Sequence, residues 1–473
     1  MAVSGRLSRR DFLSACFGAA TAAGVHGALA RRGLAAPGGR KPNIILVLAD
    51  DLGYGDIGCF GQKLIRTPVL DRMAAEGMRL TRFHAGFPVC LPSRCTLMTG
   101  LHTGHCRCRA NGGGGTHPTL EPEDTTVATV LRAGGYRTAM IGKWSLGDTF
   151  LGCVVAKHNV DGGGAIYRHG WDYYFGEPNQ TTVHSYYLDQ MYQYDRLGLM
   201  GPKTEGKRLE VVPLPGNSKT RTHYSHDLLT AKALAFLDAA KDAPFFLYLP
   251  YTVPHPKLEV PELEPYAAEA SWTGGEKVYA SMITRMDRDI GKLLARLKAH
   301  GIEKDTLVIF TSDNGASRPK EPFFSNGDLT GTKGSFQLGG VRVPCVARWP
   351  GRIQPGRSSD ELLAFWDFLP TFAELAGIRP PAPIDGVSFV PTLLGRGPQT
   401  HHPYLFFAGG MPGKQPQKPA KAAKPASPAK KPGKAAKAGS YLIVRGDGET
   451  RPDEQIIAEA RTGVVVPRFD AKG

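Results

Sequence analysis

The amino-acid sequence predicts an α/β protein built on a mainly parallel β-sheet that is flanked by helices. Three short apolar runs end in polar clusters, and these runs cover residues 44–49, 245–249 and 307–310. Continuous apolar runs of this length are typical of strands that are covered on both faces. Helical patterns occupy residues 71–76, 125–133, 226–240 and 276–299. The alternation of strand and helix therefore predicts an α/β domain.

Polar side chains follow each of the three predicted strands. Asp50 and Asp51 end the first run, His255 lies shortly after the second, and Asp313 and Asn314 follow the third. In open α/β sheets, binding and catalysis collect beyond the carboxyl ends of the strands. Carboxylate and amide oxygens suit Ca²⁺ or Mg²⁺ better than a soft metal. Taken alone, an Asp-Asp pair at a strand end is more often a turn or a helix cap.

The net charge of +15 is concentrated in two segments. Residues 1–41 contribute +6 and residues 414–437 contribute +8, which leaves +1 for the rest of the chain. A nearly neutral body does not offer the basic surface that nucleic acid requires. We therefore expect no nucleic-acid partner.

The N-terminal segment has the pattern of an export signal. Ser8-Arg9-Arg10-Asp11-Phe12-Leu13 is followed by an Ala- and Gly-rich apolar stretch that ends in Ala28-Leu29-Ala30. This pattern predicts a twin-arginine signal peptide over residues 1–36, with the twin-arginine translocase as partner and a periplasmic or secreted product. An ordinary N-terminal helix with a chance arginine pair is the alternative. No later apolar run has the length of a bilayer span, so we expect no stable membrane anchor.

Residues 401–473 differ in character from the rest of the chain. The stretch 411–440 is rich in Lys, Ala, Pro and Gly and lacks the apolar residues that a packed core needs. After it, residues 441–444 predict one short strand. Because a single strand does not form a stable sheet, we expect a reduced C-terminal region.

The most specific motif is Cys90-Leu91-Pro92-Ser93-Arg94, which continues into Thr96-Leu97-Met98-Thr99-Gly100. It resembles the C-x-P-S-R signature of the sulfatases. Further segments resemble that family in the same order, namely residues 42–44, 50–56, 142–144, 171–173, 179–180, 184–187, 254–255, 311–315, 329–333 and 339–344. The resemblance places a catalytic domain at residues 37–400 and is strongest to the arylsulfatase and N-acetylgalactosamine-6-sulfatase branch. It implies an alkaline-phosphatase-like fold.

The resemblance implies that Cys90 is the precursor of the catalytic nucleophile. In sulfatases this cysteine is oxidised to formylglycine (3-oxoalanine) by a formylglycine-generating enzyme, and the aldehyde becomes hydrated. One hydroxyl of the hydrate attacks sulfur, and deprotonation of the other releases sulfate. Arg94 would be a fixed cation beside this group. Taken alone, Cys90 would be a buried structural cysteine in a turn that contains a proline.

The remaining site residues are also implied by the resemblance. Matching positions bind Ca²⁺ in the family, and here they are Asp50, Asp51, Asp313 and Asn314, with an oxygen of the modified Cys90. Lys143 and Lys333 would contact the sulfate oxygens of a sulfated small molecule or glycan. His255 would protonate the leaving alcohol, because an alkoxide is a poor leaving group.

The chain departs from the family pattern at several positions. Many sulfatases carry His where this chain has Ser145, so His184 or Asp313 becomes a candidate for the base that this His provides. Leu338 replaces a common Glu, and the C-terminal region is reduced. Two alternatives to a sulfuric ester hydrolase therefore stay open. One is a phosphodiester or phosphonate monoester hydrolase of the same superfamily, and the other is a non-catalytic protein that binds sulfated glycans.

Overall fold

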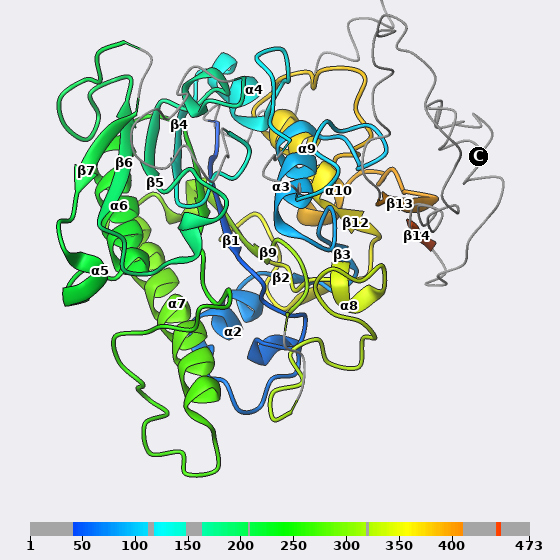
Figure 1. The fold of residues 1–473 in the computed structure, drawn as a ribbon. Coiled ribbons are helices and arrows are strands. Elements are labelled where there is room, and N and C mark those ends of the chain that lie inside the picture. The colour runs from blue at the N-terminus through cyan, green and yellow to red at the C-terminus, as the bar shows by residue number, and fades with distance from the viewer. Residues whose placement is uncertain are drawn as a thin grey trace, which may run out of the picture.

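The computed structural model describes residues 41–111, 118–147, 163–206, 209–317, 321–409 and 441–445 (Figure 1). The predicted signal peptide and the stretch 411–440 lie outside these residues. No helix in the part of the chain that the structure describes is both long and apolar enough to cross a membrane.

A ten-stranded sheet forms the centre of the molecule. In spatial order its strands are β11 (Arg357–Ser359), β2 (Met78–Leu80), β10 (Val346–Arg348), β9 (Thr306–Ser312), β1 (Asn43–Ala49), β8 (Phe245–Pro250), β4 (Arg137–Ile141), β5 (Tyr173–Gly176), β6 (Gln190–Asp195) and β7 (Glu210–Pro213). The five neighbours from β9 to β5 are parallel. Antiparallel pairs flank this block: β10 pairs with β9 and β2 on one side, and β6 pairs with β5 and β7 on the other. The predicted mainly parallel sheet is therefore confirmed.

Helices cover both faces of the sheet (Figure 1). On β1, the side chains of Ile44, Leu46 and Leu48 face one core, and those of Ile45, Val47 and Ala49 face the other. The first core is closed by α3 (Cys90–Thr99), α4 (Val127–Ala133), α9 (Phe368–Leu375) and α10 (Val390–Leu394). The second is closed by α2 (Pro68–Ala75), α6 (Ser225–Ala240) and α7 (Gly274–Ala299). Burial on both faces explains the unbroken apolar run in this strand.

The predicted helices are present, and local signals explain where they begin. At the start of α7, the Thr273 side chain accepts a hydrogen bond from the Glu276 amide, while the Glu276 carboxylate accepts one from the Thr273 amide. This reciprocal arrangement satisfies two amides that a helix start leaves unpaired. Short elements complete the fold: α5 (Asn217–Thr220), α8 (Leu338–Val341), and the 3-10 turns η1 (Gly58–Phe60), η2 (Ile166–Arg168), η3 (Thr182–His184), η4 (Glu303–Asp305) and η5 (Phe365–Asp367).

Two small sheets lie outside the central one. Strand β3 (Phe83–His84) pairs with β12 (Leu363–Ala364), and β13 (Tyr404–Ala408) pairs antiparallel with β14 (Tyr441–Arg445). The predicted strand at 441–444 is therefore present, but the expectation that it stands alone is wrong. Its partner β13 was missed because it lies on the far side of the Lys-rich stretch. Side chains of both strands pack in a cluster that includes Trp366.

Candidate active site

The carboxyl ends of four neighbouring parallel strands converge on one site. In the order β9, β1, β8 and β4, these strands are followed by the chemically active residues Asp313 and Asn314, Asp50 and Asp51, His255, and Lys143. The register pairs Ala49 with Ser312, so β1 and β9 end level with each other. Sheet geometry therefore brings together acids that are more than 260 residues apart along the chain.

Three buried carboxylates surround the Cys90 thiol. Oxygens of Asp50, Asp51 and Asp313 and the Sγ atom of Cys90 all lie within 4.8 Å of one another. Each of these side chains is at most 1% exposed. Burial, followed by the charge of Asp50, raises the pKa of Asp313 to about 7. Like charges this close, with so little water, favour binding of a cation between them.

Asn314 adds a possible oxygen ligand, its Oδ1, beside the three carboxylates. Its Nδ2 donates hydrogen bonds to Asp51 Oδ1 at 2.7 Å and to the Gly315 carbonyl at 2.9 Å. Its buried Oδ1 has no hydrogen-bond partner among the residues that the structure describes. A buried acceptor without a partner costs free energy unless something binds it. The donor set thus fits a hard cation that prefers oxygen ligands.

Cys90 is the first residue of α3, which places its side chain at the carboxylate cluster. Its Sγ lies 3.5 Å from Asp50 Oδ1 and donates to it. Burial, followed by the negative charge of Asp50, raises the pKa of the Cys90 thiol to about 12. A bound cation would offset the effect of the carboxylate but not that of burial. In the protein alone this residue is a thiol at neutral pH and a poor nucleophile.

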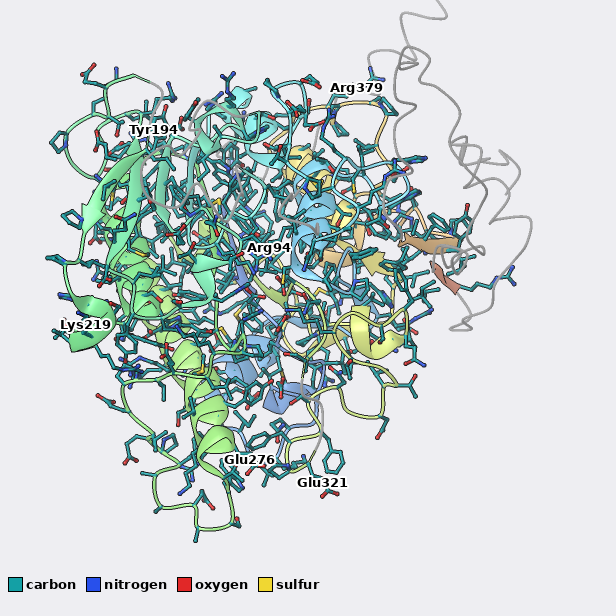
Figure 2. All side chains as sticks on the ribbon, viewed as in Figure 1. Arg94, Tyr194, Lys219, Glu276, Glu321 and Arg379 are labelled. Atoms are coloured by element: carbon teal, nitrogen blue, oxygen red, sulfur yellow. The ribbon has the colours of Figure 1, made fainter. Side chains whose placement is uncertain are left out.

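Arg94 lies one helical turn after Cys90 and is 1% exposed (Figure 2). Its Nε and Nη2 donate to Asp313 Oδ2 at 3.0 and 2.7 Å, and its Nη1 donates to the Lys143 carbonyl at 3.2 Å. Nη2 also lies 3.6 Å from Asp50 Oδ2. Arg94 therefore holds the acidic cluster from the α3 side.

Two lysine–histidine pairs also lie at the carboxylates. Lys143 Nζ lies 2.6 Å from Asp50 Oδ2 and 2.8 Å from His184 Nε2. Lys333 Nζ lies 2.7 Å from Asp51 Oδ1 and 3.1 Å from His255 Nε2. The two imidazole rings stack with centroids 3.6 Å apart and an interplanar angle of 5°. Each carboxylate of the Asp50-Asp51 pair thus has its own lysine and histidine.

These contacts assign the protonation of the histidines. A lysine ammonium only donates, so the Nε2 atoms of His184 and His255 accept from Lys143 and Lys333. His255 Nδ1 then carries the proton and donates to the Pro256 carbonyl at 2.8 Å. Burial lowers the pKa of both imidazoles, which agrees with the acceptor role of both Nε2 atoms. A ring held this way can take up a proton at Nε2.

The structure brings all ten predicted site residues into one contact network, and it adds one residue. Ser317 Oγ donates to Asp51 Oδ2 at 3.0 Å, although the sequence marks it only by its position shortly after Asp313. Ser145 is buried with a φ of 64°, and its Oγ has no partner within the described part of the chain. Its amide donates to the Pro178 carbonyl. The side chain at this position therefore provides no hydrogen bond that would replace the histidine of other sulfatases.

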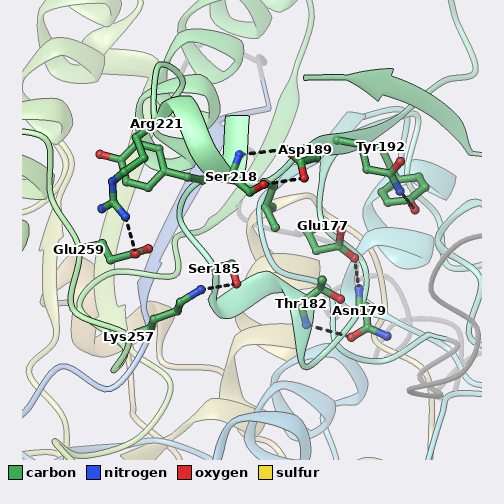
Figure 3. Close-up of a pocket in the computed structure, with 13 residues that line it drawn as sticks. Glu177, Asn179, Thr182, Ser185, Asp189, Tyr192, Ser218, Arg221, Lys257 and Glu259 are labelled. Carbon is green, nitrogen blue, oxygen red and sulfur yellow. Dashed lines mark hydrogen bonds and ion pairs between the residues drawn. The ribbon is translucent and has the colours of Figure 1, made fainter. Parts of the chain in front are cut away.

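A pocket of about 380 Å³ is lined by residues from the loops that also carry His184 and His255 (Figure 3). Its described lining includes Ser185, which directly follows His184, and Lys257, which comes two residues after His255. The rest of the wall is a mixture of aromatic and polar side chains, among them Glu177, Tyr187 and Arg221. Residues 184–187 are among the segments that resemble the sulfatases, but the sequence did not single out Lys257 or Arg221.

Comparison with known proteins agrees with this geometry. The family model described as Sulfatase matches residues 42–378. The chain belongs to the sulfatase family. This sulfatase is 33% identical to the N-acetylgalactosamine-6-sulfatase of Mus musculus over 393 residues, which span 80% of this chain and 70% of that protein. It is 34% identical to arylsulfatase A of Homo sapiens over 400 residues, which span 78% and 71% of the two chains.

A solved structure also matches this sulfatase. The crystal structure of Ps i-CgsB in complex with k-i-k-neocarrahexaose is 31% identical, covers 75% of this chain and 77% of that one, and has a TM-score of 0.61. The predicted fold is confirmed, and so is the coarse function: the protein is an enzyme that hydrolyses sulfate esters. This result favours the sulfuric ester hydrolase over the two alternatives that the sequence left open.

Replacing Arg94 should destabilise the folded protein strongly. In Arg94→Leu, Asp313 loses its buried partner, and we expect the free energy of unfolding to fall by about 3–5 kcal/mol. Urea unfolding in the presence of a chelator measures this change. The matched control is Arg72→Leu, because Arg72 pairs with Glu76 at 3.9 Å with both side chains largely exposed, and the expected change is below about 1 kcal/mol. Equal effects of the two substitutions would contradict this account of Arg94.

Proposed function

We propose that this sulfatase uses a formylglycine made from Cys90, together with a cation held by Asp50, Asp51, Asp313 and Asn314, to cleave an aryl or carbohydrate sulfate. One observation carries the proposal: the Cys90 side chain lies within 4.8 Å of three buried carboxylates, and two lysine–histidine pairs face these carboxylates. This arrangement offers negative ligands for a cation and positive donors for an anionic substrate.

The environment of Cys90 supports its modification. A buried thiol with a pKa of about 12 is not ionised at neutral pH, and a sulfate ester formed on a plain side chain would need a second attack to be released. A formylglycine at position 90 would supply, as its hydrate, one hydroxyl group as nucleophile and a second whose loss of a proton would release the sulfate. The arrangement of acids and cations around position 90 suits that chemistry.

The oxygen ligands support a bound Ca²⁺, with Mg²⁺ as the other candidate. Asp50, Asp51 and Asp313 would hold the ion through their carboxylates, and the unpartnered Oδ1 of Asn314 would complete the set. When bound, the cation supplies positive charge that stabilises the reacting oxygens. It would also allow all three carboxylates to be ionised together.

The basic residues have distinct parts in this proposal. Lys143 and Lys333 would donate hydrogen bonds to the sulfate oxygens, since both ammonium groups lie beside the carboxylates that surround Cys90. His255 would give a proton to the leaving alcohol oxygen through Nε2 after the ring has taken up a proton from water, and Lys333, 3.1 Å from this nitrogen, would orient the ring. His184 accepts a hydrogen bond from Lys143, so we propose that it positions this lysine and serves as base only when Lys143 turns to the sulfate.

The relatives suggest the substrate class. One relative is an N-acetylgalactosamine-6-sulfatase, and one solved neighbour binds k-i-k-neocarrahexaose. We propose a sulfated glycan as the natural substrate and a formylglycine-generating enzyme as the partner that modifies Cys90. The arginine pair at residues 9–10 supports export by the twin-arginine translocase to the periplasm or beyond.

Intact-mass analysis of the Cys90 peptide tests the modification directly. After co-expression with a formylglycine-generating enzyme, we expect the mass of an aldehyde or its hydrate in place of the thiol at position 90. The Cys345 peptide is the control, because this cysteine is equally buried but lacks the motif. An unmodified thiol at position 90 together with full sulfatase activity would refute the proposal.

Cation binding should stabilise the protein. For a chelator-treated sample, calcium at about 100 times its Kd should add about 2.7 kcal/mol to the free energy of unfolding, and it should restore activity. The thermal midpoint and titration calorimetry measure the effect, which Asn314→Leu should weaken and the exposed control Asp360→Asn should not. A midpoint that neither Ca²⁺ nor Mg²⁺ shifts would show that the four residues hold no cation.

His255 should matter most for substrates with poor leaving groups. We expect His255→Gln to lower kcat/KM on a carbohydrate sulfate by about 100-fold or more. The loss should be much smaller on an aryl sulfate with an acidic phenol, because such a phenolate leaves without protonation. His223→Gln, at an exposed histidine, is the matched control. Equal losses on the two substrates would rule out His255 as the acid.

A further inference from the structure

We propose that the pocket beside the catalytic centre binds the glycan that carries the sulfate ester, and that Lys257 recognises a second anionic group on this glycan, either a sulfate or a carboxylate. The inference rests on the proposed function, since it assumes that the ester sulfate is bound at the Cys90 centre. It adds a substrate class to that function, namely glycans with more than one negative charge.

The pocket and the catalytic centre share two loops. Ser185 follows His184, and Lys257 follows His255 by two residues. Lys257 Nζ donates to Ser185 Oγ at 3.1 Å, which joins the two loops at the pocket wall (Figure 3). The His184 and His255 rings stack on each other, so both loops that reach the pocket wall also carry a histidine of the catalytic centre.

The lining suits a sugar. A volume of about 380 Å³ falls in the range of about 300–1,000 Å³ that is usual for small-molecule sites. Tyr187 contributes an aromatic ring, over which the Arg221 guanidinium lies 4.2 Å from the centroid. Glu177 is 5% exposed, and burial raises its pKa to about 7, so its carboxyl group can donate to as well as accept from a hydroxyl. A wall with aromatic and polar side chains can contact both the apolar face of a sugar ring and its hydroxyl groups.

The described lining carries three carboxyl groups, on Glu177, Asp189 and Glu259, and two cations, of which Lys257 forms no ion pair with any of the three. Arg221 pairs with Glu259 at 2.9 Å, and the Asp189 carboxylate accepts hydrogen bonds from the Ser218 amide and hydroxyl at 2.8 and 2.7 Å. Lys257 contacts only the Ser185 hydroxyl, and no carboxylate among the described residues lies within ion-pair distance of it. The pocket therefore presents an ammonium group that a second anion can neutralise.

The backbone at Lys257 gives independent support. Its φ of 124° lies in a region that favours glycine, so a lysine is conformationally costly there. The described chain has five non-glycine residues with positive φ. Asp51 lies in the catalytic centre, Ser145 comes two residues after Lys143, and Arg221 and Lys257 line the pocket, while Phe324 is exposed and belongs to neither site. Because such strain collects at functional sites, the conformation of Lys257 agrees with a role in binding.

The test compares three disaccharides with the same sulfate ester: one without a further charge, one with a uronate carboxylate, and one with a second sulfate. We expect Lys257→Gly to lower kcat/KM on a doubly charged substrate by about 10- to 100-fold, the range for a hydrogen bond to a charged group. Turnover of the singly charged substrate should stay within about twofold. Glycine relieves the positive φ, so this variant is not expected to lose stability.

Two further variants define the effect. Lys257→Arg keeps the charge and should retain most of the preference for the second anion. Lys219→Ala removes a charge from the surface (Figure 2) at the residue that follows Ser218 of the pocket wall. Lys219 itself does not line the wall, so this variant should leave all three rates unchanged. The doubly charged disaccharide whose kcat/KM falls in Lys257→Gly shows whether the second anion is a sulfate or a carboxylate.

Equal losses on all three disaccharides, or no preference of the wild-type enzyme for a second charge, would overturn the inference while leaving the sulfatase activity in place. If the modified enzyme hydrolysed no sulfate ester, the proposed function itself would fail. In that case, titration calorimetry with the Cys90→Ala variant still measures whether the pocket binds the doubly charged disaccharide. Equal affinity of Cys90→Ala and of Cys90→Ala combined with Lys257→Gly for the doubly charged disaccharide would exclude recognition by Lys257.

Discussion

The confinement of three carboxylates in a dry space is the constraint on which the rest of this site depends. Asp50, Asp51 and Asp313 are held by the ends of two adjacent strands, so they cannot move apart without distortion of the sheet. Their repulsion is reduced by Arg94 on α3 and by Lys143 and Lys333. In a medium of low dielectric constant, each of these partners is strongly coupled to the others.

This coupling explains why the catalytic groups are arranged as two parallel units. Each unit consists of a carboxylate, a lysine and a histidine, and the two histidine rings are stacked. When a lysine turns from its carboxylate to a substrate oxygen, the negative charge of that carboxylate needs another positive partner. A cation among the carboxylates would supply that charge, so metal binding and substrate binding are linked in the proposed mechanism.

Much of this arrangement could be predicted from the sequence, because it depends on local patterns. The apolar run at residues 44–49 predicts a strand buried on both faces, and the position of Asp50 and Asp51 at its end predicts a site at the edge of the sheet. The resemblance around Cys90 then identifies the partners. What could not be predicted are contacts made across the fold: Arg94 with Asp313, Ser317 with Asp51, and Lys257 with Ser185. Strand β13 was missed for the same reason, since its partner lies beyond the Lys-rich stretch.

The pairing of β13 with β14 has a consequence for how this protein tolerates change. Ala408 lies opposite Tyr441 in the ladder, so the chain between the two strands begins and ends at neighbouring positions. The entropy lost when the two ends of a connecting segment are held together grows only with the logarithm of its length, at about 0.6 kcal/mol for each doubling. A change in the number of residues between β13 and β14 should therefore cost the fold little free energy, provided that the two strands still pair.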